Sequence, residues 1–396
     1  MTEKAGSIGT ATGQDGPSHA PVQREQSSGT IRPVERNDLE KIARLFLDTF
    51  YRDRKHRKER DIERVAAYMD RLYLQGPYSA DGVNSLVQVN ASGDVGGFLG
   101  LQKTRYILDG QTLSGCIIGS LMSMKDPQHS RVGAQLLWAL HGFDFDLILT
   151  DSANRRSLAF AAPLKYRTIA ANCLEWVYPL QPASMSVQRL RERWPSAPSV
   201  LLKPAEVIGE RILRKYVASK LTIPATIAGT SQITDREGFA RAAQACASGF
   251  RLRPEWDRPE LDWLLRCAED THRQGPLHYR VIHDRNGARV GCYAFYGQTG
   301  KPAKALQILA MAGSWGLVLD DFVRTAHALG CNSVVGQAHE ALLPHLYRFP
   351  GMLFYYSGGC LIRTADHDLI QHVASQEILV GGLAGDRWTR LSSGEI

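Results

Sequence analysis

The sequence predicts a mixed α/β protein that contains two copies of one α/β unit. Residues 30–180 alternate strand, helix, hairpin and strand patterns, and residues 249–396 repeat that outline. Between the copies, residues 181–248 are expected to form a helical connector. A length of 396 residues with 44% hydrophobic residues accommodates two domains of ordinary size.

The composition is typical of a water-soluble protein and limits the kinds of ligand that the protein is expected to bind. A net charge of +7 favours anionic ligands, nucleic acids or an anionic membrane surface. The seven cysteines are odd in number and never spaced Cys-x-x-Cys, so they indicate neither a disulfide framework nor a zinc site. No apolar run reaches the roughly 18 residues of a membrane-spanning helix, and the N-terminus lacks the apolar core of a secretion signal. We therefore expect a cytoplasmic protein, with membrane contact at most peripheral.

The first unit follows a polar segment. Residues 1–29 lack apolar periodicity and are expected to be a disordered tail. A strand at Ile31–Pro33 leads to a helix capped by Asn37 or Asp38. Opposite charges alternate within Arg52–Arg64, which favours a solvated helix face over a phosphate or nucleic-acid patch. A hairpin, a further strand and a turn then precede the central stretch; the strands are expected at Leu86–Val89, Val95–Leu101 and Arg105–Leu108.

The central stretch pairs a buried strand with a phosphate-type turn. The strand covers Ile117–Met124, and the helix that follows buries an apolar face from Val132 to Leu140 and ends at Gly142. The turn Gln128–Ala134 directs backbone N–H groups and the positive end of the helix dipole to one point, which attracts an anion. Gly133 lets the backbone approach that anion closely.

Further elements complete the two copies. After the central helix we expect a strand at Asp146–Thr150, a helix at Arg155–Leu164 and a strand at Ile169–Tyr178. In the connector, the amphipathic segment Val207–Leu221 favours a helix at a domain seam over a membrane-surface helix. The second copy is expected to contain a hairpin, a strand, a helix and a strand, at Tyr279–Tyr296, Ala305–Met311, Leu317–Leu329 and Ser333–Val335.

The central turn resembles the coenzyme-A loop of the GNAT (GCN5-related) acyltransferases. In their Gln/Arg-x-x-Gly-x-Gly/Ala pattern, Gln128 matches the first position and Gly133 the last, whereas Arg131 replaces the middle glycine. The element order of residues 30–180 is also the order of that family. The resemblance implies two tandem GNAT-like domains of the duplicated type found in bacterial polysaccharide, cell-envelope and lipid pathways, which includes FemAB-like relatives.

The resemblance also implies an activity and a set of binding residues. The protein would move an acyl group from acyl-CoA, or from an acyl-carrier protein, directly to an amine of a small molecule, sugar or lipid precursor, without a metal and without nucleic acid. The coenzyme-A site implied by the resemblance comprises Met122, Met124, Gln128, His129, Ser130, Arg131, Val132, Gly133, Ala134 and Asn154.

Two catalytic roles, an acid and a base, have candidate residues. Ala161 occupies the position of the family's usual tyrosine acid, but the second copy keeps Tyr347, which we take as a candidate acid; the alternative is a packing tyrosine. Asp151 follows a buried strand and is the preferred base, with Asp126 and Asp144 as other candidates. Asp151 would equally serve as a helix N-cap.

Three alternatives remain open. The segment Ala312–Gly316 is similar to the nucleophile elbow of α/β-hydrolases, with Ser314 as the nucleophile, but only a short chain follows it. A FemAB-like transferase would take its aminoacyl group from charged tRNA, which the basic charge permits. A non-catalytic module would bind the acyl donor or a partner, since each copy holds only part of the family's site residues. His339 and His345 are spaced wrongly for a zinc protease helix.

Overall fold

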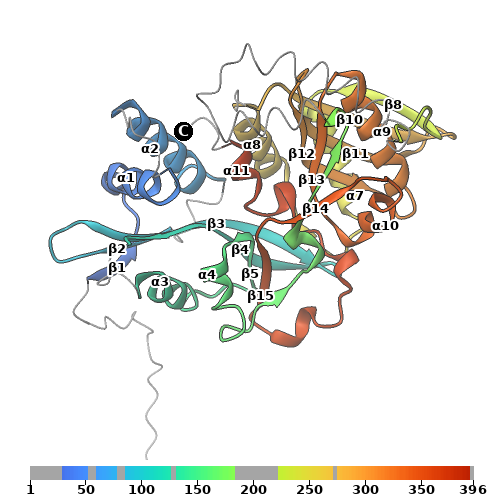
Figure 1. Ribbon diagram of the computed structural model, residues 1–396. Helices are drawn as coiled ribbons and strands as arrows, with labels where there is room; N and C mark the ends of the chain where they lie inside the picture. Colours follow the sequence, from blue (N-terminus) through green and yellow to red (C-terminus); the bar gives the residue numbers. More distant parts are fainter. Residues whose placement is uncertain are drawn as a thin grey trace, which may run out of the picture.

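The computed structural model describes residues 29–51, 59–77, 85–125, 131–182, 222–270 and 274–392. The tail 1–28, the turn residues Asp126, Gln128, His129 and Ser130, the first part of the basic run and the segment Val207–Leu221 lie outside the described residues. Within them the chain forms two mixed sheets with helices packed on their faces (Figure 1).

The first sheet is eight-stranded. Its order is β1-β2-β3-β4-β5-β15-β6, with β9 paired to β3, and β4–β5 is its parallel pair. Helices α1 and α2 lie on one side of this sheet and α3 lies on the other (Figure 1). The strands are β1 (Thr30–Pro33), β2 (Leu86–Val89), β3 (Val95–Leu108), β4 (Gln111–Ser123), β5 (Leu147–Ala153), β6 (Arg167–Thr168), β9 (Leu252–Pro254) and β15 (Gly359–Thr364). The helices are α1 (Leu39–Phe50), α2 (Glu59–Tyr73), α3 (Val132–Leu140) and α4 (Arg155–Leu158).

The second sheet is seven-stranded and repeats that layout. From its far edge the order is β8-β10-β11-β12-β13-β7-β14, and the fourth and fifth strands, β12 and β13, again form the parallel pair. The strands are β7 (Leu174–Pro179), β8 (Gly229–Thr234), β10 (Leu277–Asp284), β11 (Arg289–Tyr296), β12 (Pro302–Ala310), β13 (Ser333–Gln337) and β14 (Leu353–Tyr356). The helices of this half are α7 (Arg236–Ala247), α8 (Arg258–Glu269), α9 (Trp315–Ala328), α10 (Leu343–Leu346) and α11 (Trp388–Ser392). Two sheets of matching order are compatible with two tandem domains.

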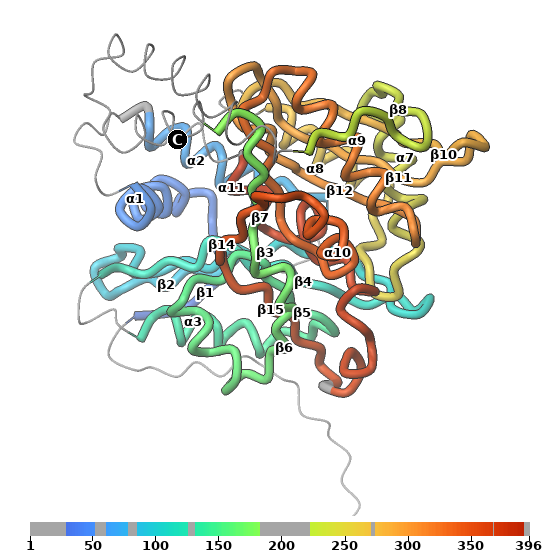
Figure 2. The backbone as a smooth tube through the Cα atoms, turned by 45° about the vertical axis from the view of Figure 1, so that its right-hand side comes forward, coloured from blue at the N-terminus to red at the C-terminus, as the bar shows by residue number. Residues whose placement is uncertain are grey.

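The halves of the chain exchange strands: the first half gives β7 to the second sheet, and the second half gives β15, in addition to β9, to the first. β7 precedes the predicted connector, yet it lies between β13 and β14 of the second sheet. β15 follows all other strands, yet it lies between β5 and β6 of the first sheet (Figure 2). The strand expected at Ile169–Tyr178 therefore exists from Leu174 onward, but it does not complete the first sheet. In addition, β8 and α7, which lie within 181–248, belong to the second sheet and its cover.

The predicted helices and strands are confirmed best where a buried face determines the spacing of the apolar residues. Helix α3 begins at Val132 and buries Leu136, Leu137 and Leu140, as its periodicity predicts. Two predictions were wrong in extent. The strand expected at Arg105–Leu108 is the end of the long β3, and the helix expected at Arg155–Leu164 is only the short α4 followed by turns. Within the described residues, the structure contains no helix of sufficient length and apolarity to cross a membrane.

Candidate active site

The candidate site is the gap where β4 and β5 diverge. The two strands pair in parallel only over Gly115–Ile117 and Leu147–Leu149. Beyond this point β4 bulges, because Phe98 faces Met122 whereas Gly100 faces Gly119. Ser120 lies in the bulge with a φ of 50°, in the left-handed region. The diverging strands border a cavity of about 550 Å³, which is lined by residues of both strands and by α1, α2 and the C-terminal segment.

A pair of glycines makes room for Tyr73 beside the bulge. Gly100 and Gly119 face each other across β3 and β4, and a Cβ atom on Gly100 would lie 2.4 Å from the Tyr73 ring. The Tyr73 hydroxyl donates a hydrogen bond of 2.9 Å to Ser120 Oγ. Burial raises the pKa of Tyr73, so the phenol keeps its proton at neutral pH. Ser120 Oγ therefore accepts a hydrogen bond from Tyr73, and its own hydroxyl proton can be donated to a group in the cavity.

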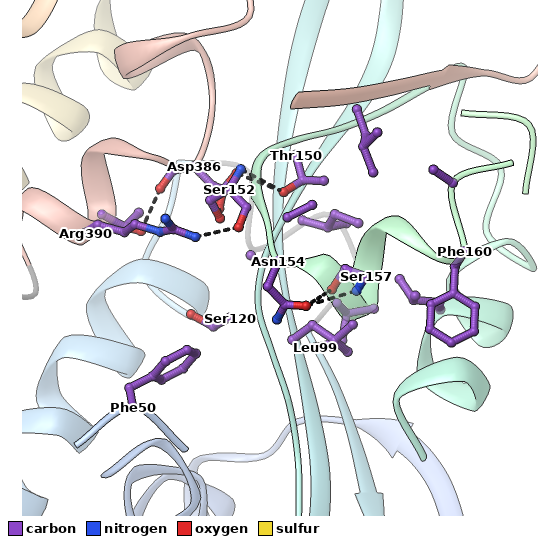
Figure 3. A pocket seen from close by; sticks show the side chains of 18 of the residues that line it. Phe50, Leu99, Ser120, Thr150, Ser152, Asn154, Ser157, Phe160, Asp386 and Arg390 are labelled. Atoms are coloured by element: carbon purple, nitrogen blue, oxygen red, sulfur yellow. Dashed lines mark hydrogen bonds between the residues drawn. The ribbon is translucent and has the colours of Figure 1, made fainter. Parts of the chain in front are cut away.

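The carboxylate in the cavity comes from the far end of the chain. Asp386 is 3% exposed and belongs to the C-terminal segment, just before α11. Its Oδ1 accepts hydrogen bonds from Thr150 Oγ1 at 3.1 Å and from the Asp151 backbone N–H at 2.8 Å. The Ser152 hydroxyl donates to Oδ2 (Figure 3). These donors, all on β5, hold the Asp386 carboxyl group at the edge of the gap.

Asp151 and Asp386 are joined by two reciprocal hydrogen bonds, because each carboxyl group accepts the backbone N–H of the other residue. Its Oδ1 accepts the backbone N–H groups of Asp386 and Arg387, both at 2.8 Å. The side chain is fully buried, and burial, followed by the nearby Asp386 carboxylate, raises the pKa of Asp151 well above its ordinary value. Asp151 therefore holds a proton more readily than an ordinary aspartate does. The N-cap reading of Asp151 was wrong, because Asn154 caps α4.

Asn154 and an apolar group of side chains line the opposite part of the cavity. Asn154 Oδ1 accepts the backbone N–H groups of Arg156 and Ser157, both at 2.9 Å, which leaves its amide nitrogen for a ligand. The apolar lining around it includes Leu99, Leu137, Phe160, Leu164 and Tyr166. In Figure 3, Phe160 lies to the right of Asn154 and Ser157, whereas Asp386, Ser120 and Phe50 lie to their left. The cavity therefore passes through the gap from one face of the sheet to the other.

The start of α3 leaves its glycine open. Apart from the backbone of α3 itself, no atom of the described residues lies within 4 Å of a Cβ built on Gly133, whereas the neighbouring Val132 side chain is buried. Arg131 is exposed and Ala134 is half-buried. Met122 is buried, and Met124 is 39% exposed and donates its backbone N–H to Gly96 O at 2.9 Å. None of these residues is part of the described cavity lining, so their assignment to a coenzyme-A site stays a prediction.

The remaining sequence candidates lie elsewhere. Tyr347 is 70% exposed at the end of α10, with its ring 5.5 Å from that of Phe354, and the structure does not bring it to the cavity. Asp144 is exposed in the loop before β5. Ser314 stands at the N-cap position of α9, outside the described lining of this cavity and of the corresponding one in the second sheet.

The corresponding gap in the second sheet is partly filled. β12 and β13 pair in parallel over Pro302–Lys304 and Ser333–Val335 and then diverge. The short 3-10 helix η8 (Gly382–Ala384) enters there, and its backbone N–H groups donate to two glutamines. Leu383 N donates to Gln307 Oε1 at 2.8 Å, and Gly382 N donates to Gln337 Oε1 at 3.1 Å. A cavity of about 270 Å³ remains.

Sequence reasoning missed the residues that complete the first gap. Asp386 lies 235 positions from Asp151, and no local pattern around it indicates a site. Ser120, Ser152 and Tyr73 looked like ordinary strand and helix residues. The closest available signal was the glycine content of the central strands, since Gly100 and Gly119 mark the place where another side chain must approach.

Comparisons with known proteins identify the fold through solved structures and not through sequence similarity. No family model and no curated protein matches the sequence. Among solved structures, a GCN5-related N-acetyltransferase from Anabaena variabilis aligns with a TM-score of 0.55 and 10% identity over 87% of this chain and 74% of its own. A protein of unknown function from Enterococcus faecalis, described as a probable N-acyltransferase, aligns with a TM-score of 0.53 and 11% identity over the same shares. The chain therefore has the GNAT fold, as the sequence predicted.

Proposed function

We propose that the protein transfers an acyl group from an acyl-CoA thioester to an amine at the gap between β4 and β5. One observation carries the proposal: the strands diverge around an open cavity into which Asp386 projects, fixed by three donors of β5. The GNAT fold supports acyl transfer as the class of reaction, because its solved neighbours are described as N-acyltransferases.

The residues on the α3 side fit a CoA thioester. Asn154 offers an amide nitrogen, Tyr166 has a buried hydroxyl without a partner among the described residues, and the lining between them is apolar. The open backbone at Gly133 and the start of α3 would hold the pyrophosphate. When bound, the thioester supplies an activated acyl carbon and a thiolate leaving group.

The residues on the α1 and α2 side would take the proton of the amine and stabilise the negative charge that develops on the carbonyl oxygen. Acylation requires a neutral amine nitrogen, and Asp386, directly or through Ser152, is placed to take its proton. The nitrogen–acyl bond forms as the carbon–sulfur bond breaks, and the thiolate takes a proton from solvent. At the bulge of β4, backbone N–H groups leave the ladder with β3 and would polarise the thioester carbonyl. Ser120, held by Tyr73, would donate a hydrogen bond to the developing negative charge.

A thiol-release assay tests this proposal. The full chain is incubated with acetyl-CoA or a longer acyl-CoA and a panel of amines, and CoA binding is measured separately by calorimetry. We expect amine-dependent thiol release and saturable CoA binding. CoA binding without turnover on any amine would favour a non-catalytic acyl-CoA module. Turnover that requires charged tRNA and is abolished by ribonuclease would favour the FemAB-like alternative.

A further inference from the structure

We propose that the acceptor is a monoamine on an apolar alkyl or aryl body, bound between an aromatic wall and Asp386. This inference rests on the proposed function and names the substrate class of the same site. The aromatic wall consists of Phe46, Phe50 and Tyr51 of the end of α1 and Tyr68 of α2, all of which line the cavity. Phe46 forms its centre, with ring centroids 4.9 Å from Phe50, 5.9 Å from Tyr51 and 6.2 Å from Tyr68.

The wall is fixed against the segment that carries the carboxylate. The Tyr68 hydroxyl donates to Thr389 O at 2.9 Å, three residues after Asp386. Figure 3 shows Phe50, Ser120 and Asp386 together to the left of Asn154. Phe50 is 51% exposed, which is unusual for a large aromatic side chain and places an apolar surface at the cavity entrance. An amine entering here meets aromatic rings first and the carboxylate next.

The charge of the lining selects against other amines. Asp386 is the one carboxylate among the described lining residues, and Arg390 is the one strong cation. The Arg390 guanidinium donates to the backbone carbonyls of Ser152 and Ser357. A polyamine would therefore bring several ammonium groups to a single carboxylate, and the surplus charges would lose water without gaining a partner. A sugar amine would bring several hydroxyl groups to the wall, where the Phe46 and Phe50 rings offer them no hydrogen-bond partner.

One ammonium on an apolar body fits both features. Its hydrocarbon part contacts the wall, an aromatic face attracts the ammonium, and Asp386 pairs with it before taking a proton. The experiment compares phenethylamine and hexylamine with spermidine and glucosamine at saturating acetyl-CoA. We expect kcat/KM at least tenfold higher for the two apolar amines. Calorimetric binding of phenethylamine in the presence of CoA gives a readout that does not require turnover.

A variant of the wall sharpens the test. Phe50→Ser should raise the KM and the calorimetric Kd for phenethylamine about tenfold, with the KM for acetyl-CoA unchanged. Ile233→Ser is the matched control, because Ile233 is 78% exposed on β8, outside the described lining, and should change neither constant.

The outcomes separate the two proposals. Thiol release that is fastest with spermidine or glucosamine, and insensitive to Phe50→Ser, would overturn the acceptor class while the acyltransferase proposal stands. Phenethylamine binding that Phe50→Ser weakens, without thiol release, would support the acceptor site and count against the reaction. Failure of phenethylamine to bind or react would overturn the inference.

Discussion

The two sheets share one strand order but differ in what occupies the gap at their parallel pair. In the first sheet, β4 and β5 diverge around a cavity of about 550 Å³ edged by Asp386, Ser120 and Ser152. In the second, β12 and β13 diverge around the inserted η8, whose N–H groups are satisfied by Gln307 and Gln337. The same geometry therefore leaves a larger cavity in one half and a smaller, partly filled one in the other.

The C-terminal segment accounts for the difference because it contacts both gaps. Its residues 382–384 enter the second gap, and a few positions later Asp386 reaches the first. Insertion of backbone requires hydrogen-bond acceptors, which the two glutamines supply. Presentation of a carboxylate requires donors, which Thr150, Asp151 and Ser152 supply. The identity of a few side chains on equivalent strands thus decides which gap remains open.

The largest effect is expected from Asp386→Asn in the open gap. The amide keeps the shape of the side chain but cannot accept the proton of the amine, so kcat for thiol release should fall by about 10²- to 10⁴-fold. The KM for acyl-CoA should stay the same. Glu237→Gln, at an exposed carboxylate of α7, serves as the control. A variant that folds and keeps its kcat would remove Asp386 as the base.

Leu383→Ala tests the filled gap. Leu383 is 1% exposed within η8, and its truncation should lower the free energy of unfolding by about 2–5 kcal/mol in a denaturant titration. Leu353→Ala, at a side chain that is 37% exposed on β14, should lower the free energy of unfolding by a smaller amount. Thiol release by the folded Leu383 variant should persist. Its loss under conditions where the variant is fully folded would mean that both gaps take part in activity.

The histidine beside the filled gap predicts a pH dependence of stability. His339 stacks on Trp315 with ring centroids 5.2 Å apart, its Nε2–H donates to Ile378 O at 3.1 Å, and burial lowers its pKa to about 4. The ordinary pKa is about 6.5, so the unfolded chain binds the proton first as the pH falls. The free energy of unfolding is therefore unaffected by His339 above about pH 6.5. It decreases as the pH falls through 4, by about 3 kcal/mol in total. Urea titrations across that range should show the loss in the wild type, and His339→Gln should lack that part of it.

The smallest of the four effects concerns the donor side of the open gap. At Gly133 no atom of the described part of the chain, outside the backbone of α3, lies within 4 Å of an added Cβ, so the fold of Gly133→Glu should persist. Repulsion between the new carboxylate and the pyrophosphate should weaken CoA binding at least tenfold, on the order of 1.4 kcal/mol. Ser314→Glu adds the same charge at the start of α9 in the second sheet and should leave the Kd for CoA unchanged. Equal CoA affinities for Gly133→Glu and wild type would show that the start of α3 is not the pyrophosphate site.

The sequence predicted elements better than their assembly. The apolar periodicity of α3 reports which face of the helix is covered, and the helix was found as expected. The strand expected at Ile117–Met124 exists within β4, which begins earlier, at Gln111. Periodicity does not report which sheet a strand joins, because β7 and β15 would be equally covered in either one. The site was half predictable for the same reason. Asn154 follows β5 and lines the cavity, whereas Asp386 arrives through a contact between segments 235 positions apart.

The exchange of β7 and β15 has a consequence for biosynthesis. A nascent chain that has emerged only as far as β14 holds β5 with one edge unpaired, and such edges recruit other chains. The same nascent chain also lacks its carboxylate, since Asp386 follows β15. The carboxylate proposed as the base and the strand that covers the edge of β5 therefore both follow β14, and a product that ended at β14 would lack both.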